Sequence, residues 1–386
     1  MTSLLFITLI LLIAGAGVAW LLRLSGVPGG RPASVVLAGV IVGVLAGPGI
    51  FGQVSPDRWM GAFRGGVDEL SALRAVERQQ EIDRLAIEAS GVSEAYVDEF
   101  VAAHKVDLDA ARQVLDAAQA SHASMVGAVS IALGSVWILL VFSAVRIHLP
   151  RVPLPLSTVG PFLLIALVVG GLCVLAGPMT PTAGAIMAVL LLSPGVGLRT
   201  KGSVGRVTST AAITSIVTLG AALAIARPDS HVLLVPFVVM LAGLAVSARW
   251  PVVARAAVLR GADHLAPGLI AFTIAMLDLH ALGGSRLFWV AAVAGLIIAS
   301  DGRWLLYWMA LRCTGGCDAP WRAGALIVNR GSGLAALIVG GMLMATGAMA
   351  PALVAGLVIG AMVSECTRPL RMSLATWLDT NEFSER

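Results

Sequence analysis

The chain has 386 residues, of which 58% are hydrophobic and only 12% are charged, and its mean hydropathy is +0.91. A soluble domain of this length has no room to bury so much apolar surface, so the composition excludes a soluble globular protein. The formal net charge is +4, and the Lys and Arg residues stand singly, which excludes a nucleic-acid-binding surface.

Uncharged stretches of about 20 residues recur along the chain, and this is the length that a helix needs to cross a hydrocarbon layer. The first, Leu4 to Leu22, is interpreted as a retained span rather than a signal peptide, because no basic region precedes it and another span follows. The sequence predicts an all-α membrane protein with about eleven transmembrane helices. They are expected at residues 3–22, 34–54, 126–145, 157–176, 181–197, 207–226, 231–248, 265–282, 287–311, 321–342 and 347–366.

One polar insert, from Ser55 to Met125, interrupts this pattern and holds 13 of the 22 acidic residues. Its apolar residues between 71 and 89 have helical spacing, Ser93 can cap a second helix, and a third is expected from Asp107 toward the next span. Two interpretations stay open: a solvated helical hairpin packed on the outer mouth, or a partner-binding or gating element. The expected domains are 1–54 with the first two spans, the insert 55–125, the remaining spans 126–371 and a tail 372–386.

Basic residues are distributed very unequally between alternate loops. One set of loops holds 14 of them, whereas the other set, apart from the insert, holds only Arg227 and Arg286. By the positive-inside rule the first set is cytoplasmic. We therefore expect a multi-pass protein of the cell membrane, with the N-terminus and the insert outside and the C-terminus in the cytoplasm.

Ionisable groups inside a span are costly, so each is a candidate for function. Asp301 and Arg303 lie near the middle of the predicted span 287–311 and, two residues apart on a helix, face different partners. Two interpretations stay open: an internal ion pair that holds two helices together, or a role in an ion or proton path. Asp278 and Glu365 lie near span ends and are interpreted as interfacial charges.

Two Gly-containing segments interrupt apolar spans, one in each half of the chain. Asn329 and Arg330 open the segment 329–333, and Ser193 opens the segment 193–197. Unwound segments free backbone carbonyls that hold ions at the membrane midplane, and paired breaks are typical of inverted-repeat carriers. The sequence therefore predicts two discontinuous helices in an inverted repeat.

The sequence lacks a catalytic or metal-binding constellation. The six His residues form no cluster, and the pair Cys313 and Cys317 has neither a second pair nor a nearby His. Ser/His/Asp groupings and phosphate-binding loops are also missing. The chain is therefore not expected to be an enzyme, nor to hold a metal or a cofactor.

Except for the insert, nearly the whole chain resembles the cation/proton antiporter superfamily, the sodium/proton exchangers and their potassium-efflux relatives. Residues 21–52, with Leu37-Ala38-Gly39 and Gly47-Pro48, resemble the second helix of the family. Residues 134–145 resemble its third helix, and 184–200 its first discontinuous helix. Arg303 falls on the membrane-embedded Lys or Arg of the family, and Asn329-Arg330-Gly331 resembles the Arg-Gly of its second discontinuous helix.

Two departures from the family matter. The family carries one or two adjacent aspartates, which bind cation and proton alternately, where this chain has Thr214 and Ser215. Hydroxyls can ligate a cation but cannot release a proton near neutral pH. The second half also lacks two spans expected between Ala226 and Leu265, so the inverted repeat is incomplete.

The resemblance implies an atypical monovalent cation/proton antiporter, with Asp301 as a displaced carrier that alternates between cation-bound and protonated states. The alternative is a homologue decoupled from transport, acting as a passive conduit, a sensor or a scaffold that binds a partner through the insert. The expected partners are Na+ or K+, the proton, the lipid bilayer, a second copy of the chain and a protein at the insert; nucleic acid is not expected. The residues assigned to the ion or proton path are Asp301, Arg303, Asn329, Arg330, Thr214, Ser215 and Ser193.

The predicted topology places Ser90, in the insert, outside the cytoplasm. In intact cells, a Ser90→Cys variant should react with a thiol reagent that does not cross membranes, because the charge asymmetry of the loops fixes this side as external. Reaction only after permeabilisation would reverse the topology.

Overall fold

The computed structural model describes residues 2–27, 30–90, 94–144, 204, 207–208, 211, 215, 234–247, 251–279, 282, 288–289, 292–293, 301–314, 317–328 and 332–384. Every regular element among them is a helix. The prediction of an all-α protein is confirmed for this part of the chain.

Three helices in the described residues are long and apolar enough to cross a membrane. They are α1 (Thr2–Leu24), α2 (Gly30–Ala46) continued by the short α3 (Phe51–Val54), and the second half of α6 (Glu94–Ala144). Helices α17 (Pro351–Cys366) and α18 (Arg368–Ser384), bent by 60° at the break between them, add a fourth if they count as one span. The chain is a membrane-embedded helical protein.

The three candidate spans coincide with the first three predicted ones. Helices α10 (Leu234–Ser247) and α16 (Ser332–Ala345) are apolar but shorter, and each lies largely within a further predicted span. The predicted spans that fall wholly or almost wholly outside the described residues are 157–176, 181–197 and 207–226.

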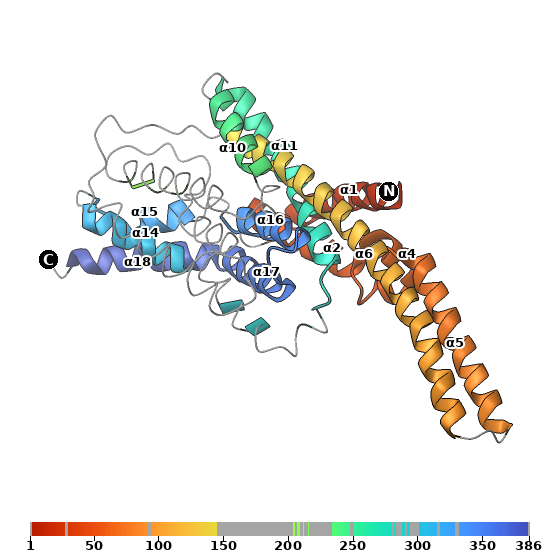
Figure 1. Ribbon diagram of the computed structural model, residues 1–386. Coiled ribbons are helices and arrows are strands. Elements are labelled where there is room, and N and C mark those ends of the chain that lie inside the picture. Colours follow the sequence, from red (N-terminus) through yellow and green to blue (C-terminus); the bar gives the residue numbers. More distant parts are fainter. Residues whose placement is uncertain are drawn as a thin grey trace.

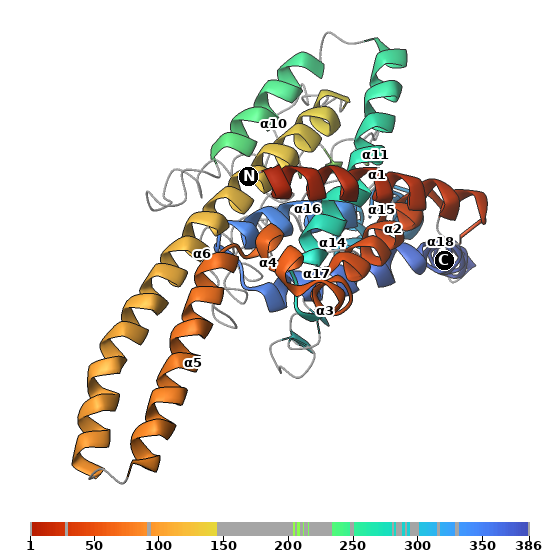
Figure 2. The same ribbon diagram turned by 90° about the vertical axis from the view of Figure 1, so that its right-hand side faces the viewer.

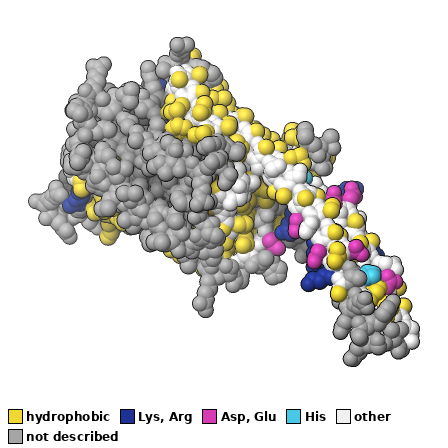
Figure 3. All heavy atoms as spheres, viewed as in Figure 1, with side chains coloured by type: hydrophobic (Ala, Val, Ile, Leu, Met, Phe, Trp, Pro, Cys, Tyr) yellow, Lys and Arg dark blue, Asp and Glu magenta, His cyan; other side chains and the backbone are white. Residues whose placement is uncertain are grey.

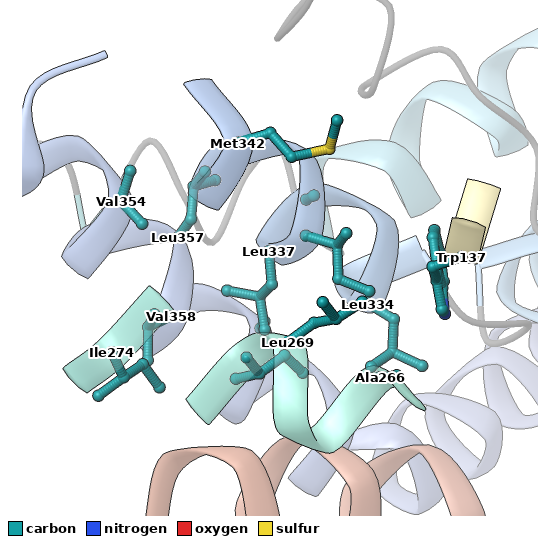
Figure 4. Packing of buried hydrophobic residues seen from close by; sticks show 14 of the residues in the cluster. Trp137, Ala266, Leu269, Ile274, Leu334, Leu337, Met342, Val354, Leu357 and Val358 are labelled. Atoms are coloured by element: carbon teal, nitrogen blue, oxygen red, sulfur yellow. The ribbon is translucent and has the colours of Figure 1, made fainter. Parts of the chain in front are cut away.

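Helix α11 (Val252–Ala275) is central to the bundle and packs against α1, α2, α6 and α16. The largest apolar core gathers buried side chains from α2, α6, α10, α11, α16 and α17. In Figure 4, Leu269 of α11 lies beside Leu334 and Leu337 of α16, and Ile274 lies beside Val358 of α17. Residues far apart in the sequence thus meet along α11.

Glycines allow α11 to approach its neighbours closely. A Cβ atom added at Gly39 of α2 would lie 2.6 Å from Cβ of Ile270, and one added at Gly268 would lie 2.5 Å from Cα of Leu12 in α1. Both distances are too short for any side chain without a shift of the helices. In lipid, such close packing replaces the hydrophobic effect as the force that holds helices together.

Helices α5 (Val67–Ala89) and α6 form a long antiparallel hairpin that extends away from the bundle (Figures 1 and 2). Helix α6 has 51 residues and is therefore about 75 Å long. The predicted start of a separate helix at Asp107 is wrong, because α6 is continuous from Glu94, but the predicted continuation into the membrane span is confirmed. Between Glu94 and Gly127 the sequence has no Gly or Pro, so nothing in this stretch would end the helix.

The hairpin is attached at its base by hydrogen bonds to the bundle. Trp59 in α4 (Pro56–Phe63) donates its indole N–H to the carbonyl of Ala275, at 3.3 Å. His122 of α6 is buried, and its Nε2 lies 2.9 Å from the carbonyl oxygen of Ala62. These contacts fix the direction in which the hairpin leaves the bundle.

The two parts of the molecule differ in surface chemistry. In Figure 3, hydrophobic side chains cover α10 and the adjoining part of α6, whereas acidic and basic side chains gather on the hairpin. Val235, Val238 and Leu241 are among the exposed apolar residues of α10. An exposed apolar surface is favourable where a helix contacts lipid, whereas the charged side chains of the hairpin are favourably solvated by water.

Replacing Gly39 by Ala is expected to destabilise the bundle by about 1 to 3 kcal/mol, because the new methyl group overlaps Ile270. The matched control is Gly17→Ala in α1, where the added Cβ would meet no atom within 4 Å. That variant should be neutral or slightly more stable, since alanine favours a helix. Thermal unfolding of both variants in one detergent measures the difference; equal midpoints would contradict the close approach of α2 and α11.

Candidate functional site

Helix α14 (Asp301–Thr314) carries two fully buried polar side chains. Arg303 is 1% exposed and Tyr307 is 0% exposed. Their spacing of four residues puts them on one face of the helix, and their side chains are hydrogen-bonded to each other. A guanidinium has no acceptor, so it donates to the tyrosine hydroxyl oxygen.

The end of α17 and the start of α18 bring further charges to this pair. Glu365 and Arg371 are 3% and 4% exposed, and Glu365 interacts electrostatically with Arg303, Arg368 and Arg371. Arg371 donates from Nη2 to the carbonyl oxygen of Ser364 at 3.0 Å and to its hydroxyl at 3.3 Å. The buried charged cluster consists of Arg303, Tyr307, Glu365 and Arg371.

Burial of these groups is costly and has to be compensated within the protein. A charge removed from water without a partner is strongly destabilising, while opposite charges and hydrogen bonds recover much of that cost. Glu365 interacts with the guanidinium groups of Arg303, Arg368 and Arg371, and these opposite charges offset part of the cost of burying it. Ionisable clusters inside membrane proteins mark ion or proton pathways, or hold helices together.

Helix α18 also fixes the start of α15 (Pro320–Val328). The carboxylate of Asp379, which is buried, accepts hydrogen bonds from the backbone N–H groups of Trp321 at 3.1 Å and of Arg322 at 2.8 Å. The first N–H groups of a helix lack partners within the helix, and negative charge is favourable there. Asp379 therefore caps α15 from a different helix.

Tryptophan side chains pack α14 against α15. The rings of Trp308 and Trp321 are stacked with their centroids 4.2 Å apart, and Trp304 donates its indole N–H to the carbonyl of Trp321 at 2.9 Å. Arg303 and Tyr307 lie on the same helix as Trp304 and Trp308. The aromatic contacts thus hold the buried charged cluster in register with α15.

Of the predicted site residues, Arg303 lies in the buried charged cluster. Asp301 is the first residue of α14, and only its backbone is described. Ser215 is buried and donates its hydroxyl to the carbonyl of Ala211 at 2.7 Å. The predicted residues that lie outside the described part are Ser193, Thr214, Asn329 and Arg330; the last two fall between the end of α15 and the start of α16.

The interpretation of Glu365 as an interfacial charge is wrong, because its side chain is buried beside Arg303. The chain bends by 60° directly after α17, and α18 then brings Arg368 and Arg371 next to this carboxylate. Arg368, three residues after Glu365, was the available signal in the sequence. Asp278, by contrast, is exposed, as expected for an interfacial charge.

A second carboxylate with charged neighbours lies just before the predicted span 265–282. Burial raises the pKa of Asp263 in α11, and the positive charges of Arg23 and Arg31 oppose that rise. Arg23 also donates its Nε–H to the hydroxyl of Ser34 at 3.3 Å. These residues form a polar set at the end of the bundle that the predicted topology places in the cytoplasm.

Comparisons with family models, curated proteins and solved structures found no match to this chain. In the part of the chain that the structure describes, no group of three or more His, Cys, Asp or Glu residues is arranged to hold a metal ion. The membrane helices and the buried charged cluster are therefore the basis for assigning a function.

Removal of the Asp379 carboxylate is expected to loosen the start of α15. An Asp379→Ala variant leaves the N–H groups of Trp321 and Arg322 without their acceptor, at a cost of about 1 to 3 kcal/mol. Thr380→Ala, on an exposed face of the same helix, is the control. Hydrogen exchange at residues 321–324 should become faster in the first variant only; unchanged exchange would rule out the cap.

Proposed function

We propose that this chain is an atypical monovalent cation/proton antiporter of the cell membrane, in which a buried carboxylate takes up and releases the proton. The observation that carries the proposal is the burial of Glu365 beside Arg303 in a membrane-embedded helical protein. A proton carrier needs a carboxylate held away from bulk water, whose charge is balanced differently in two states of the protein.

Two carboxylates are candidates for the carrier. Asp301 lies two residues before Arg303 on α14, and Glu365 approaches Arg303 from α17. Protonation of Glu365 removes a negative charge that interacts with the guanidinium groups around it. The protonated and ionised forms therefore favour different arrangements of α14, α17 and α18, which is the requirement for coupling a proton to a movement of helices.

The cation needs oxygen ligands rather than guanidinium groups. We assign it to the hydroxyls of Thr214 and Ser215, together with the backbone carbonyls of the proposed breaks at Ser193 and at Asn329-Arg330. Ser215 donates its hydroxyl hydrogen to the carbonyl of Ala211, which leaves the oxygen lone pairs available to a cation. Na+ and K+ both bind such oxygens, and the proton is the counter-ion of the exchange.

The proposed architecture has about eleven spans, two discontinuous helices and an external insert. The proposed second break, at Asn329-Arg330-Gly331, lies outside the described residues. In Figure 2 the hairpin extends beyond the N-terminal end of α1, and the C-terminus lies toward its other end. This arrangement supports an external hairpin and a cytoplasmic C-terminus.

A second candidate function is a decoupled homologue that acts as a conduit, a sensor or a scaffold. Two observations favour it. No carboxylate stands at Thr214 and Ser215, and the hairpin of α5 and α6 offers a long surface outside the bundle. In that case the buried charged cluster holds helices together, and the hairpin binds a partner protein.

Exchange measured in proteoliposomes separates the two functions. With a pH-sensitive dye inside and each alkali cation added in turn, the native protein should give cation-dependent proton flux. Glu365→Gln should abolish the flux if Glu365 is the carrier, and Asp301→Asn should abolish it if Asp301 is. Thr214→Ala and Ser215→Ala should change the cation preference or affinity more than the coupling.

Asp278→Asn is the matched control, since it neutralises an exposed carboxylate, and it should leave the flux unchanged. Size-exclusion profiles in detergent check that each variant is folded. Normal exchange by both Glu365→Gln and Asp301→Asn would rule out the carrier. No proton flux in the native protein, together with flux in the Ser215→Asp variant, would identify the decoupled homologue.

A further inference from the structure

Helix α18 has three distinct faces. The buried face consists of Arg371, Ala375 and Asp379, which recur every four residues and are turned toward the protein. A second face, roughly a third of a turn away, carries the exposed apolar side chains of Leu370, Leu374 and Trp377, which are 68%, 43% and 59% exposed. The third face carries the exposed residues Ser373, Thr376 and Thr380.

The apolar face continues from a helix that belongs to the membrane part. Val363, near the end of α17, is 41% exposed, and Leu370, Leu374 and Trp377 follow it at spacings of seven, four and three residues. Between Val363 and Leu370 the chain bends by 60°. Exposed apolar side chains therefore lie on both sides of this bend, at the end of α17 and along α18.

The orientation of α18 fits a membrane surface. Helix α1, a candidate span, lies in the plane of Figure 2. In the same view α18 is seen nearly end-on, near the C-terminal end of α1. In Figure 1, α18 is seen along its length. Helix α18 therefore runs crosswise to α1 at one end of the bundle, as a helix in the interface does.

We propose that α18 is an interfacial helix whose face of Leu370, Leu374 and Trp377 lies in the boundary between lipid headgroups and acyl chains, while its face of Arg371, Ala375 and Asp379 holds α15 and α17. An amphipathic helix in the interface buries an apolar face shallowly in the lipid and exposes a polar face to water, and tryptophan is enriched at this depth. The hydroxyl face of Ser373, Thr376 and Thr380 meets the second condition. The inference rests on the membrane-embedded character of the chain and not on transport.

Spin labels at single cysteines test this assignment. In a background with Cys173, Cys313, Cys317 and Cys366 replaced by Ser, labels are placed at Leu374→Cys and at Thr376→Cys, which lies on the hydroxyl face of the same helix. The protein is reconstituted in vesicles of phosphatidylcholine and phosphatidylglycerol. Collision of each label with oxygen, which concentrates in lipid, and with a water-soluble nickel chelate is then measured.

The oxygen-to-nickel collision ratio should be several-fold higher at position 374 than at position 376, and Leu370→Cys should repeat the result for position 374. Equal, nickel-accessible labels at 374 and 376 would overturn the proposal, because both faces would then lie in water. An immobile label at 374 that neither reagent reaches would overturn it as well, since a second copy of the chain or another protein would then cover this face.

Discussion

A guanidinium group that is 1% exposed within an apolar helix bundle imposes a condition on everything around it. Arg303 cannot be neutralised at any ordinary pH, so its charge has to be met by partners inside the protein. Tyr307 supplies an acceptor from the same helix, and Glu365 supplies the opposite charge from another. Because Glu365 stands at the end of α17, this electrostatic interaction couples α14 to α17.

Helix α18 extends this constraint to α15. Arg371 holds the last turn of α17 through Ser364, and Asp379, two turns further along the same helix, caps α15. A tilt of α18 therefore has to carry both helices with it or break these hydrogen bonds. Since α15 leads directly to the proposed break at residues 329–331, a contact between α18 and the membrane surface would be transmitted to the region where an ion is proposed to bind.

The sequence predicted best where one local property decides the structure. Leu4 to Leu22 has no charge and no helix breaker over its whole length, so α1 followed directly from composition. A separate helix was expected from Asp107, whereas α6 runs unbroken through this position. The reliable signal was the lack of Gly and Pro between Glu94 and Gly127.

The candidate site was only partly predictable, for a different reason. Arg303 stood out because it interrupts an apolar span, and it is buried as expected of such a residue. Glu365 did not stand out, since its environment is made by a bend of 60° that follows it, and position near a span end does not reveal such a bend. The role of Asp379 depends on a contact with Trp321, 58 residues away in the sequence, which only the fold brings about.

If the chain works as the proposed antiporter, the arginines around Glu365 restrict how it can do so. A cation entering between Arg303, Arg368 and Arg371 is repelled by all three, whereas a proton on Glu365 removes a negative charge from beside them. A cation and a proton that compete for one carboxylate, the scheme implied by the family resemblance, therefore do not suit Glu365. Proton and cation would instead occupy separate sites, the proton at Glu365 and the cation at hydroxyl and carbonyl oxygens, and their exchange would be coupled by the helices that connect the sites. If Glu365 instead stays ionised throughout, the same arginines make the cluster a permanent internal ion pair, and transport has to proceed through Asp301 or be lost.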